Sequence, residues 1–285
     1  MKAPSLIPRF VKRSILYCTL ILVLTAAIFP IVWVVLTSIK PPAYTFAIPP
    51  KWVFTPTFES YRQLFLDGFA ALGVDIWLNM SNSIIIGVTS TAATVVISCY
   101  AAYGLSRFRF PGRNAMGLLI IATRMLPPVG TMIPFFLLIN SLGLLDTRTA
   151  LILAYTGLNI PFATWMLRGF FDEVPKELDE AAMVDGCNRN RMLWQIILPL
   201  IAPGLAATAV FSFLLSWNDF ALALVLTSRN AKTLPLIVTS FITDEGISWG
   251  PMSAAATVVL IPPIILMLLT QKHIAKGLTM GAVKG

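Results

Sequence analysis

Residues 173–190 read EVPKELDEAAMVDGCNRN and form a polar interval between two long apolar segments. The interval predicts a short helix, because Pro175 suits a first helical turn and acidic side chains gather near the positive end of the helix dipole. Gly186 predicts where this helix ends, since a left-handed residue after the last turn costs least without a Cβ. A second helix is expected to begin after Asn188 and to run to Pro199. The stretch therefore predicts helix, break, helix.

One face of the first predicted helix is narrow and built mostly from small side chains. Positions i, i+3, i+4 and i+7 of a helix share a face. Here those positions are Leu178, Ala181, Ala182 and Asp185. We expect such a face to let another protein approach closely.

The composition predicts an integral membrane protein. The 285 residues are 57% hydrophobic and 12% charged, and the mean hydropathy of +0.80 is too high for a soluble domain of this length. The net charge of +8 does not indicate nucleic acid binding, because the basic residues are scattered through the loops and share no face or run. Three isolated cysteines and one histidine, His273, predict neither a disulfide framework nor a metal site.

Six apolar segments are each about 18 to 26 residues long, enough to cross a hydrocarbon core of about 30 Å as helices. They lie at about 15–37, 82–105, 115–140, 150–167, 202–226 and 252–270. Prolines are expected to interrupt the third segment, and a tail at 271–285 follows the sixth. We therefore predict an all-α membrane protein with six transmembrane helices in a single domain over residues 1–285.

An even number of spans places both termini on one side of the membrane, and the basic residues indicate which side. The termini and the loops on their side hold fourteen Lys and Arg, whereas the opposite loops hold six. By the positive-inside rule, the termini and the loop at 173–199 are expected to be cytoplasmic. The loops at 38–78 and 227–251 are then external.

A spaced motif in the polar loop carries a family resemblance. Glu180-Ala181-Ala182 is followed after three residues by Gly186, after nine more by Ile196, and then by Leu198-Pro199. This pattern resembles the EAA loop of the membrane subunits of bacterial ATP-binding-cassette (ABC) importers. The resemblance implies a coupling helix that docks on a separate cytoplasmic ATPase.

The resemblance also assigns roles within that loop. It implies contacts with the ATPase from Glu180, Ala181, Ala182, Asp185, Gly186 and Pro199. Glu180 is expected to pair with a basic group of the ATPase, and the small residues to permit close docking. The alternative for Glu180 and Asp185 is that they are ordinary solvated charges.

Four further stretches resemble the carbohydrate-uptake branch of these importers, specifically its maltose-type smaller permease subunit. They are AAYGLSRFRFPGR at 101–113, IPFFLLINSLGLLDTRTALIL at 133–153, WNDF at 217–220 and GLTMGAVKG at 277–285. The fold implied is the type I ABC importer transmembrane domain. The resemblance also implies that the tail reaches between two ATPase subunits, with Gly277, Leu278, Thr279 and Lys284 as contacts. Glycines from Lys276 onward permit an extended path, and a frayed terminus is the alternative.

Arg124 is a charge inside the third predicted span. It lies about nine residues into the span, roughly 13 Å deep by helical rise. A charge at that depth costs at least about 2.5 kcal/mol, so it is expected to face the bundle interior or a water-filled path. Two uses stay open. Arg124 either pairs with a backbone carbonyl, for example one freed by Pro127 or Pro128, or lines the route of a solute.

Other polar residues within the spans are further candidates for contacts with a polyhydroxylated solute. They are Asn140, Tyr155, Asn159, Asn218 and Asp219. Amide, carboxylate and aromatic groups suit a sugar. Hydrogen bonding between helices is the alternative, and we favour it.

The sequence contains no catalytic constellation. It lacks a GxxxxGK[ST] phosphate-binding loop, a GxSxG elbow and an HExxH pair. Transport powered by ATP thus requires ATP and Mg²⁺ on a partner ATPase, with no cofactor on this chain. The partners implied by the resemblance are a homologous second permease subunit, two ATPase subunits, an external solute-binding protein and a carbohydrate, and the expected location is the bacterial inner membrane.

Two other classes of function compete with this interpretation. A secondary carrier driven by an ion gradient would use membrane-embedded ion sites, for which only Asp219 and Arg124 qualify. A membrane enzyme or assembly scaffold would need a reactive cluster, which the sequence lacks. Purification with or without a co-migrating ATPase tests these alternatives. The sequence does not identify the solute.

Overall fold

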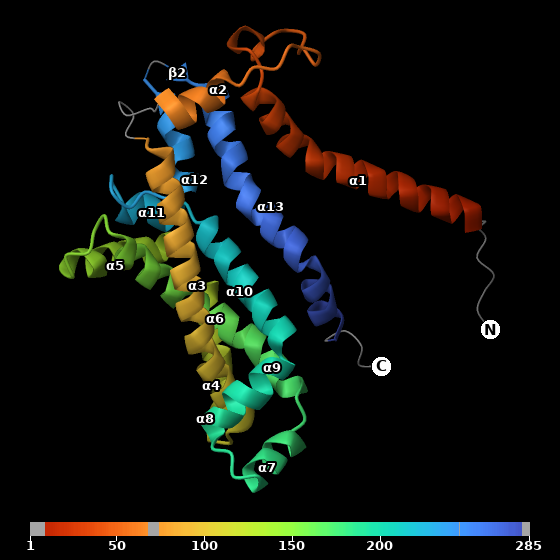
Figure 1. Cartoon of the computed structure of the whole chain (residues 1–285), viewed down its shortest axis with the longest axis vertical. Helices are drawn as coiled ribbons and strands as arrows, with labels where there is room; N and C mark the ends of the chain where they lie inside the picture. The colour runs from red at the N-terminus through yellow and green to blue at the C-terminus, as the bar shows by residue number, and fades with distance from the viewer. Residues whose placement is uncertain (1–8, 68–73, 245, 281–285) are drawn as a thin grey trace. The chain divides into compact units, whose positions relative to one another are not determined.

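The computed structural model of the chain (Figure 1) describes residues 9–67, 74–244 and 246–280, with the backbone alone at residues 9, 67 and 128 and over 272–280. The described chain is helical apart from an antiparallel pair of two-residue strands, β1 (Ile242–Thr243) and β2 (Gly246–Ile247). The α-helices are α1 (Arg9–Ser38), α2 (Glu59–Arg62), α3 (Ile76–Arg107), α4 (Arg113–Ala122), α5 (Pro128–Ser141), α6 (Arg148–Glu173), α7 (Glu177–Val184), α8 (Arg189–Met192), α9 (Leu198–Leu200), α10 (Ala202–Trp217), α11 (Ala221–Leu226), α12 (Leu234–Ile237) and α13 (Trp249–Met280). Shorter 3₁₀ or π turns are η1 (Pro42–Tyr44), η2 (Gln63–Asp67), η4 (Thr123–Met125), η5 (Leu193–Ile197) and η6 (Val238–Phe241).

The chain divides into two compact units. The first comprises residues 1–69 and 241–258 and contains α1, α2, the strand pair and the start of α13. In this unit Ser38 at the end of α1 bonds to Tyr61 of α2, with 2.8 Å between the hydroxyl oxygens. The apolar window of α1 has a mean hydropathy of 2.7, and none of it is buried in the structure. An apolar helix without a packed face needs lipid or another chain around it.

The second unit comprises residues 70–240 and 259–285 and is built around α3, α6 and α10, which pack against one another (Figure 1). Two apolar cores lie along this bundle. One joins the end of α3 to α7, η5 and α9, and it includes Phe171 and Ile197. The other joins α3, α5, α6, α11 and α12 and includes Leu151 and Leu226.

Four described helices are long and apolar enough to cross a membrane, and six candidate spans result if each of two bent helix pairs counts as one. The continuous helices cover residues 10–38, 76–107, 148–173 and 249–271. The bent pairs are 113–125 with 129–141, at 95°, and 189–200 with 202–217, at 85°. The first bend falls at Pro127 and Pro128, where the sequence predicted an interruption, because proline removes helical hydrogen bonds.

Two predicted segments differ from the observed helices. The segment expected at 202–226 ends as a helix at Trp217, and α11 starts anew at Ala221, because Asp219 Oδ1 accepts the N–H of Leu222 at 3.0 Å. The tail expected to be extended from Lys276 is helical through Met280. A single glycine in this run costs a helix only about 1 kcal/mol, which its helix-forming neighbours offset.

Candidate functional site

Helix α7 lies in the polar loop and has the predicted C-terminus. Gly186 follows the last turn with a φ of +78°, in the left-handed region. The N–H of Cys187 donates to Ala182 O at 3.0 Å and the N–H of Gly186 donates to Met183 O at 3.1 Å. These two bonds form a Schellman motif, which satisfies carbonyls at the helix end. The predicted glycine stop is confirmed.

The two faces of α7 differ. Asp179 and Ala182 are buried against the chain's own core, whereas Glu180 and Ala181 are exposed. Val184 is 88% exposed. The predicted docking face is thus divided, because Ala182 packs with Phe171 and neighbouring residues of the apolar core at the end of α3 and α6. Asp185 and Gly186 are exposed at the end of the helix.

A buried ion pair joins α7 to the end of α3. Arg107 Nε lies 2.6 Å from Asp179 Oδ2, and the two side chains are 4% and 10% exposed. The same guanidinium donates from Nη2 to Val174 O at 3.0 Å, between α6 and α7. Burial raises the pKa of Asp179 above its ordinary value, although the charge of Arg107 acts in the opposite direction. Sequence reasoning missed this pair, since no local pattern links residues 72 positions apart.

The second half of the loop is anchored separately to α3. Asn188 caps α8 by accepting the N–H of Arg191 at 2.8 Å. Trp194 Nε1 donates to the Tyr100 hydroxyl of α3 at 3.0 Å. Pro199 lies in α9, two residues before Ile201, where an 85° bend leads into α10. The polar contacts of both halves therefore converge on the last two turns of α3.

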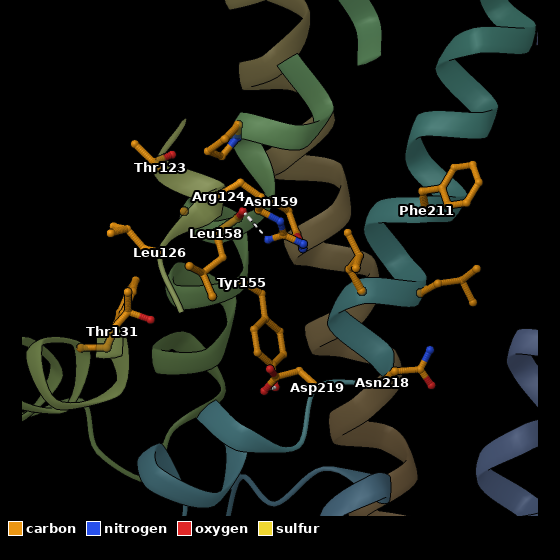
Figure 2. Close-up of a pocket in the computed structure, with 15 residues that line it drawn as sticks. Thr123, Arg124, Leu126, Thr131, Tyr155, Leu158, Asn159, Phe211, Asn218 and Asp219 are labelled. Carbon is orange, nitrogen blue, oxygen red and sulfur yellow. Dashed lines mark hydrogen bonds between the residues drawn. The ribbon is translucent and has the colours of Figure 1, made fainter. Parts of the chain in front are cut away.

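A second candidate site is a cavity of about 720 Å³ between η4, α5, α6 and α10 (Figure 2). Five of the predicted path residues line it: Arg124, Tyr155, Asn159, Asn218 and Asp219. Asn140 does not line this cavity and lies exposed near the end of α5.

Arg124 makes a contact with a backbone carbonyl, one of the two uses that the sequence left open, and also lines the cavity. Its Nη1 donates to Leu158 O at 2.9 Å (Figure 2). The carbonyl that it binds belongs to α6 and lies three residues before Pro161, not at Pro127 or Pro128. A proline disturbs the helical bonds of the preceding turn, so this carbonyl is a natural acceptor for another side chain.

Most of the other polar groups of the cavity are bonded within the chain. The Tyr155 hydroxyl donates to Asp219 Oδ1 at 3.1 Å (Figure 2), and that oxygen also accepts the N–H groups at the start of α11. Asn159 is 2% exposed and donates to Ser216 Oγ at 2.9 Å. Asn218 is exposed at the cavity. The favoured alternative, hydrogen bonding between helices, is what Tyr155 and Asn159 do.

A carboxylate just before α6, which the sequence did not single out, accepts several hydrogen bonds from the loop at 228–231. Asp146, with a φ of +57°, accepts four successive backbone N–H groups of 228–231 at 3.0 to 3.2 Å. Burial raises the pKa of Asp146, but these donors outweigh burial and hold the pKa well below its ordinary value. Asn82 of α3 donates from Nδ2 to Asn230 O and Lys232 O at 2.9 and 3.0 Å. The loop is thus fixed to α3 and to the start of α6.

The remaining predicted residues lie in or beyond the last helix. Gly277, Leu278 and Thr279 lie in α13, where only the backbone is described, and Lys284 lies outside the described residues. Within the described ranges no group of three or more His, Cys, Asp or Glu side chains is placed to hold a metal ion.

Comparison with known proteins places these features in context. The family model described as "Binding-protein-dependent transport system inner membrane component" matches residues 94–280. The sulfoquinovosyl glycerol transport system permease protein SmoH of Agrobacterium fabrum is 37% identical over 97% of this chain and 93% of its own length. The trehalose/maltose transport system permease protein MalG of Thermococcus litoralis is 37% identical over 96% of this chain and 98% of its own.

A solved structure is similar over nearly the whole chain. It is described as a bacterial ABC transporter involved in the import of the acidic polysaccharide alginate. The matching chain has a TM-score of 0.74 at 25% identity, with 94% of this chain and 99% of that chain covered. The likeness therefore extends to the helices on both sides of the polar loop.

Proposed function

The chain belongs to the family of binding-protein-dependent transport system inner membrane components, and on this premise we propose that α7 couples its membrane helices to a separate ATPase during carbohydrate import. It is the multi-pass permease subunit of an ABC importer, whose ATPase and binding protein are separate subunits. This membership sets aside the ion-gradient carrier and the scaffold. ATP hydrolysis belongs to the partner ATPase.

The exposed face of α7 is the observation that carries the coupling proposal. Val184 is 88% exposed on the side of α7 opposite the buried Asp179 and Ala182, and Leu178 and Met183, at the two edges of that side, are 41% and 45% exposed. Apolar side chains gathered on a surface mark contact with a partner, and Glu180 beside them supplies a charge for pairing. A helix held on one side and open on the other suits docking into a cleft of the ATPase.

Motion of α7 has a direct route to the membrane helices. Arg107 ties α7 to the end of α3 through Asp179, and Trp194 ties the following segment to Tyr100, one to two turns earlier in α3. We infer that closure of the ATPase displaces α7 and α8 together with the end of α3. The bends at 113–141 and 189–217 are where such a displacement is expected to change which side of the membrane the cavity faces.

The groups that line the cavity suit a polar solute. Asn218 and Arg124 offer amide and guanidinium groups, and Phe211 offers aromatic surface (Figure 2). Amide groups and aromatic rings are suited to sugar hydroxyls and ring faces. Relatives named for trehalose, maltose and sulfoquinovosyl glycerol transport agree with a carbohydrate or a carbohydrate-like solute.

We further propose the composition of the complex. This chain would pair with a homologous permease subunit, with two ATPase subunits that bind ATP and Mg²⁺, and with a binding protein docked on the loops at 38–78 and 227–251. The tail from Gly277 to Lys284 would reach toward the ATPase pair. The unburied helix α1 is consistent with contacts beyond this chain.

Charge reversal on the exposed face of α7 tests the coupling proposal. In Glu180→Arg, the complex should remain in the membrane while solute transport falls at least about tenfold, because a close charge pair becomes a repulsive contact. The matched control is Glu173→Arg, an exposed carboxylate at the end of α6. Uptake of labelled solute into proteoliposomes, with ATP hydrolysis measured in parallel, gives the result. Parental transport in Glu180→Arg contradicts the assignment.

A pair of asparagines tests the solute route. Asn218→Ala should lower the transport rate about three- to tenfold at saturating loaded binding protein, which corresponds to one lost hydrogen bond. Asn159→Ala should instead lower the yield of assembled complex, because it leaves Ser216 without its amide partner inside the bundle. Equal transport per assembled complex in both variants and the parent would exclude a solute contact at Asn218.

A further inference from the structure

A second cavity, of about 450 Å³, lies at the start of α4 and is lined by three cationic side chains, Arg109, Arg113 and Lys176. They come from two places in the chain, the turn after α3 and the N-cap of α7. None of the residues that line the cavity is acidic. Asp172 and Asp179 are engaged elsewhere, since Asp172 accepts a bond from Ser106 and Asp179 pairs with Arg107. The exposed Glu173, Glu177 and Glu180, which flank Lys176 in the chain, do not line the cavity.

The backbone adds to the positive field of this cavity. Gly112 is the N-cap of α4, with a φ of +79°, and it lines the cavity. The first N–H groups of a helix have no partner within the helix, and α4 is ten residues long, so its start carries the positive end of a helix dipole. No acidic residue occupies the first turn of α4. A cleft lined by charge of one sign concentrates counter-ions of the other sign.

The cavity also lies at the start of a candidate membrane span. Helix α4 forms the first half of the bent span 113–141. Leu118 and Leu119, about one to two turns beyond the cavity, are 69% and 68% exposed. Such apolar exposure on a membrane helix is a surface for lipid tails. A headgroup belonging to those tails would reach the level of Arg113.

We propose that Arg109, Arg113 and Lys176 bind a phosphate group at the cytoplasmic membrane surface. The orientation rests on the proposed function, which places the polar loop on the cytoplasmic side. Two arginines and a lysine match the oxygens of a phosphate, and basic pockets at this level bind anionic lipid headgroups. The phosphate comes either from an anionic phospholipid or from solution. A ligand here would touch both the N-cap of α7 and the start of α4, and so would stiffen the joint that carries coupling.

The test uses the complete purified transporter in three forms. One is the parent, and one carries Arg109→Gln, Arg113→Gln and Lys176→Gln. The control carries Lys51→Gln, Arg229→Gln and Lys232→Gln, which remove three cations from the predicted external loops. Binding of phosphatidylglycerol, phosphatidylethanolamine and inorganic phosphate is titrated by native mass spectrometry. Co-purification of the ATPase is scored in every preparation, so loss of the proposed assembly is seen separately from loss of the ligand.

We expect the parent and the control to retain phosphatidylglycerol at least about tenfold more strongly than the cavity variant, since each cation near an anionic surface contributes about fivefold. Phosphatidylethanolamine should not distinguish the three forms. If inorganic phosphate binds in the same order and displaces phosphatidylglycerol, the source is free phosphate. Equal retention of both ligands by the parent and the cavity variant overturns the proposal. Should the triple variant fail to assemble, the single variants are compared by the same titration.

Discussion

Two aspartates, one near each end of the second unit, hold a loop to the bundle in different ways. Asp179 meets one guanidinium from another helix, Arg107, whereas Asp146 meets four successive backbone N–H groups. Burial dominates at Asp179 and raises its pKa, while at Asp146 the N–H donors outweigh burial and lower the pKa. A carboxylate that accepts bonds from several successive backbone N–H groups holds that backbone in one conformation, so it fixes a loop. A carboxylate paired with a side chain links two helices that can move together.

The different bonding of Asp179 and Asp146 fits the function proposed for each end of the second unit. In the proposed function the loop at 227–251 is the outer loop that docks the binding protein, and backbone bonds at Asp146 suit a surface that stays constant. In the proposed function the polar loop transmits displacement, and a few side-chain contacts connect it to α3.

Removal of the guanidinium at the moving joint should have the largest effect. Arg107→Ala leaves Asp179 buried without a partner, and breaking a buried pair costs about 3 to 5 kcal/mol. We expect solute transport per assembled complex to fall at least about tenfold while ATP hydrolysis persists, measured in proteoliposomes. Arg168→Ala is the control, because its pair with Asp172 spans 3.6 Å and is half-exposed, and exposed pairs contribute about 0 to 1 kcal/mol.

The double variant Arg107→Ala with Asp179→Ala separates coupling from folding. Removing both charges relieves the unpaired carboxylate, so the yield of folded complex should recover. Transport should stay low, because α7 has lost its link to α3. Recovery of transport together with yield would show that the pair serves stability alone.

The outer carboxylate should have a smaller effect, and one confined to stability. In Asp146→Asn an amide NH₂ replaces one oxygen and faces the donors of Asn230. Charged hydrogen bonds contribute about 1.5 to 3 kcal/mol, and screening at this half-exposed site leaves roughly 1 kcal/mol, or about 2 to 4 °C in Tm. Asp244→Asn, an exposed carboxylate of the loop at 242–247, is the control. Thermal unfolding in detergent measures the shift in Tm. A transport defect per folded complex would contradict the expectation that Asp146 affects stability alone.

How far the sequence predicted these features depends on the range of each signal. Local signals succeeded, as the left-handed Gly186 and the proline bend of the third span show. The family resemblance, which rests on spaced motifs, was also confirmed. The sequence did not predict the contacts of Arg107 and Asp146 with residues far away in the chain. Neither charge stands out by its local pattern from the other charges between the apolar segments.

The cavity shows a second limit of the sequence. Polar residues within apolar segments indicated that something polar lies there, but not which way each side chain points. Asn159 bonds within the bundle, Asn140 lies outside the cavity, and Asn218 lines it. The break at Asp219 was missed because the surrounding segment is apolar on both sides, so composition alone predicts a continuous helix. The direction in which a side chain points depends on how the helices pack, and no local sequence pattern shows that packing.

The smallest expected effect is a pair of opposite pH dependences. At Asp146 the folded-state pKa is lowered, so its carboxylate contributes stability that is present above the unfolded pKa of about 3.9 and is lost as the pH falls below it. At Asp179 the folded-state pKa is raised, so the contribution is present below about 3.9 and is lost as the pH rises through the folded-state pKa. The Tm of the parent minus that of Asp146→Asn should therefore grow between about pH 3 and 6. The same difference for Asp179→Asn should shrink over that window.

Each neutral variant serves as the other's control in this measurement, and Asp244→Asn reports the background change. Because detergent-solubilised membrane proteins unfold irreversibly, all forms are scanned at one heating rate. If both Tm differences change in the same direction with pH, the folded structure shifts the pKa of both carboxylates in the same direction. The fixed outer loop and the movable joint would then no longer be distinguished by their chemistry, and the role of Arg107 would rest on transport alone.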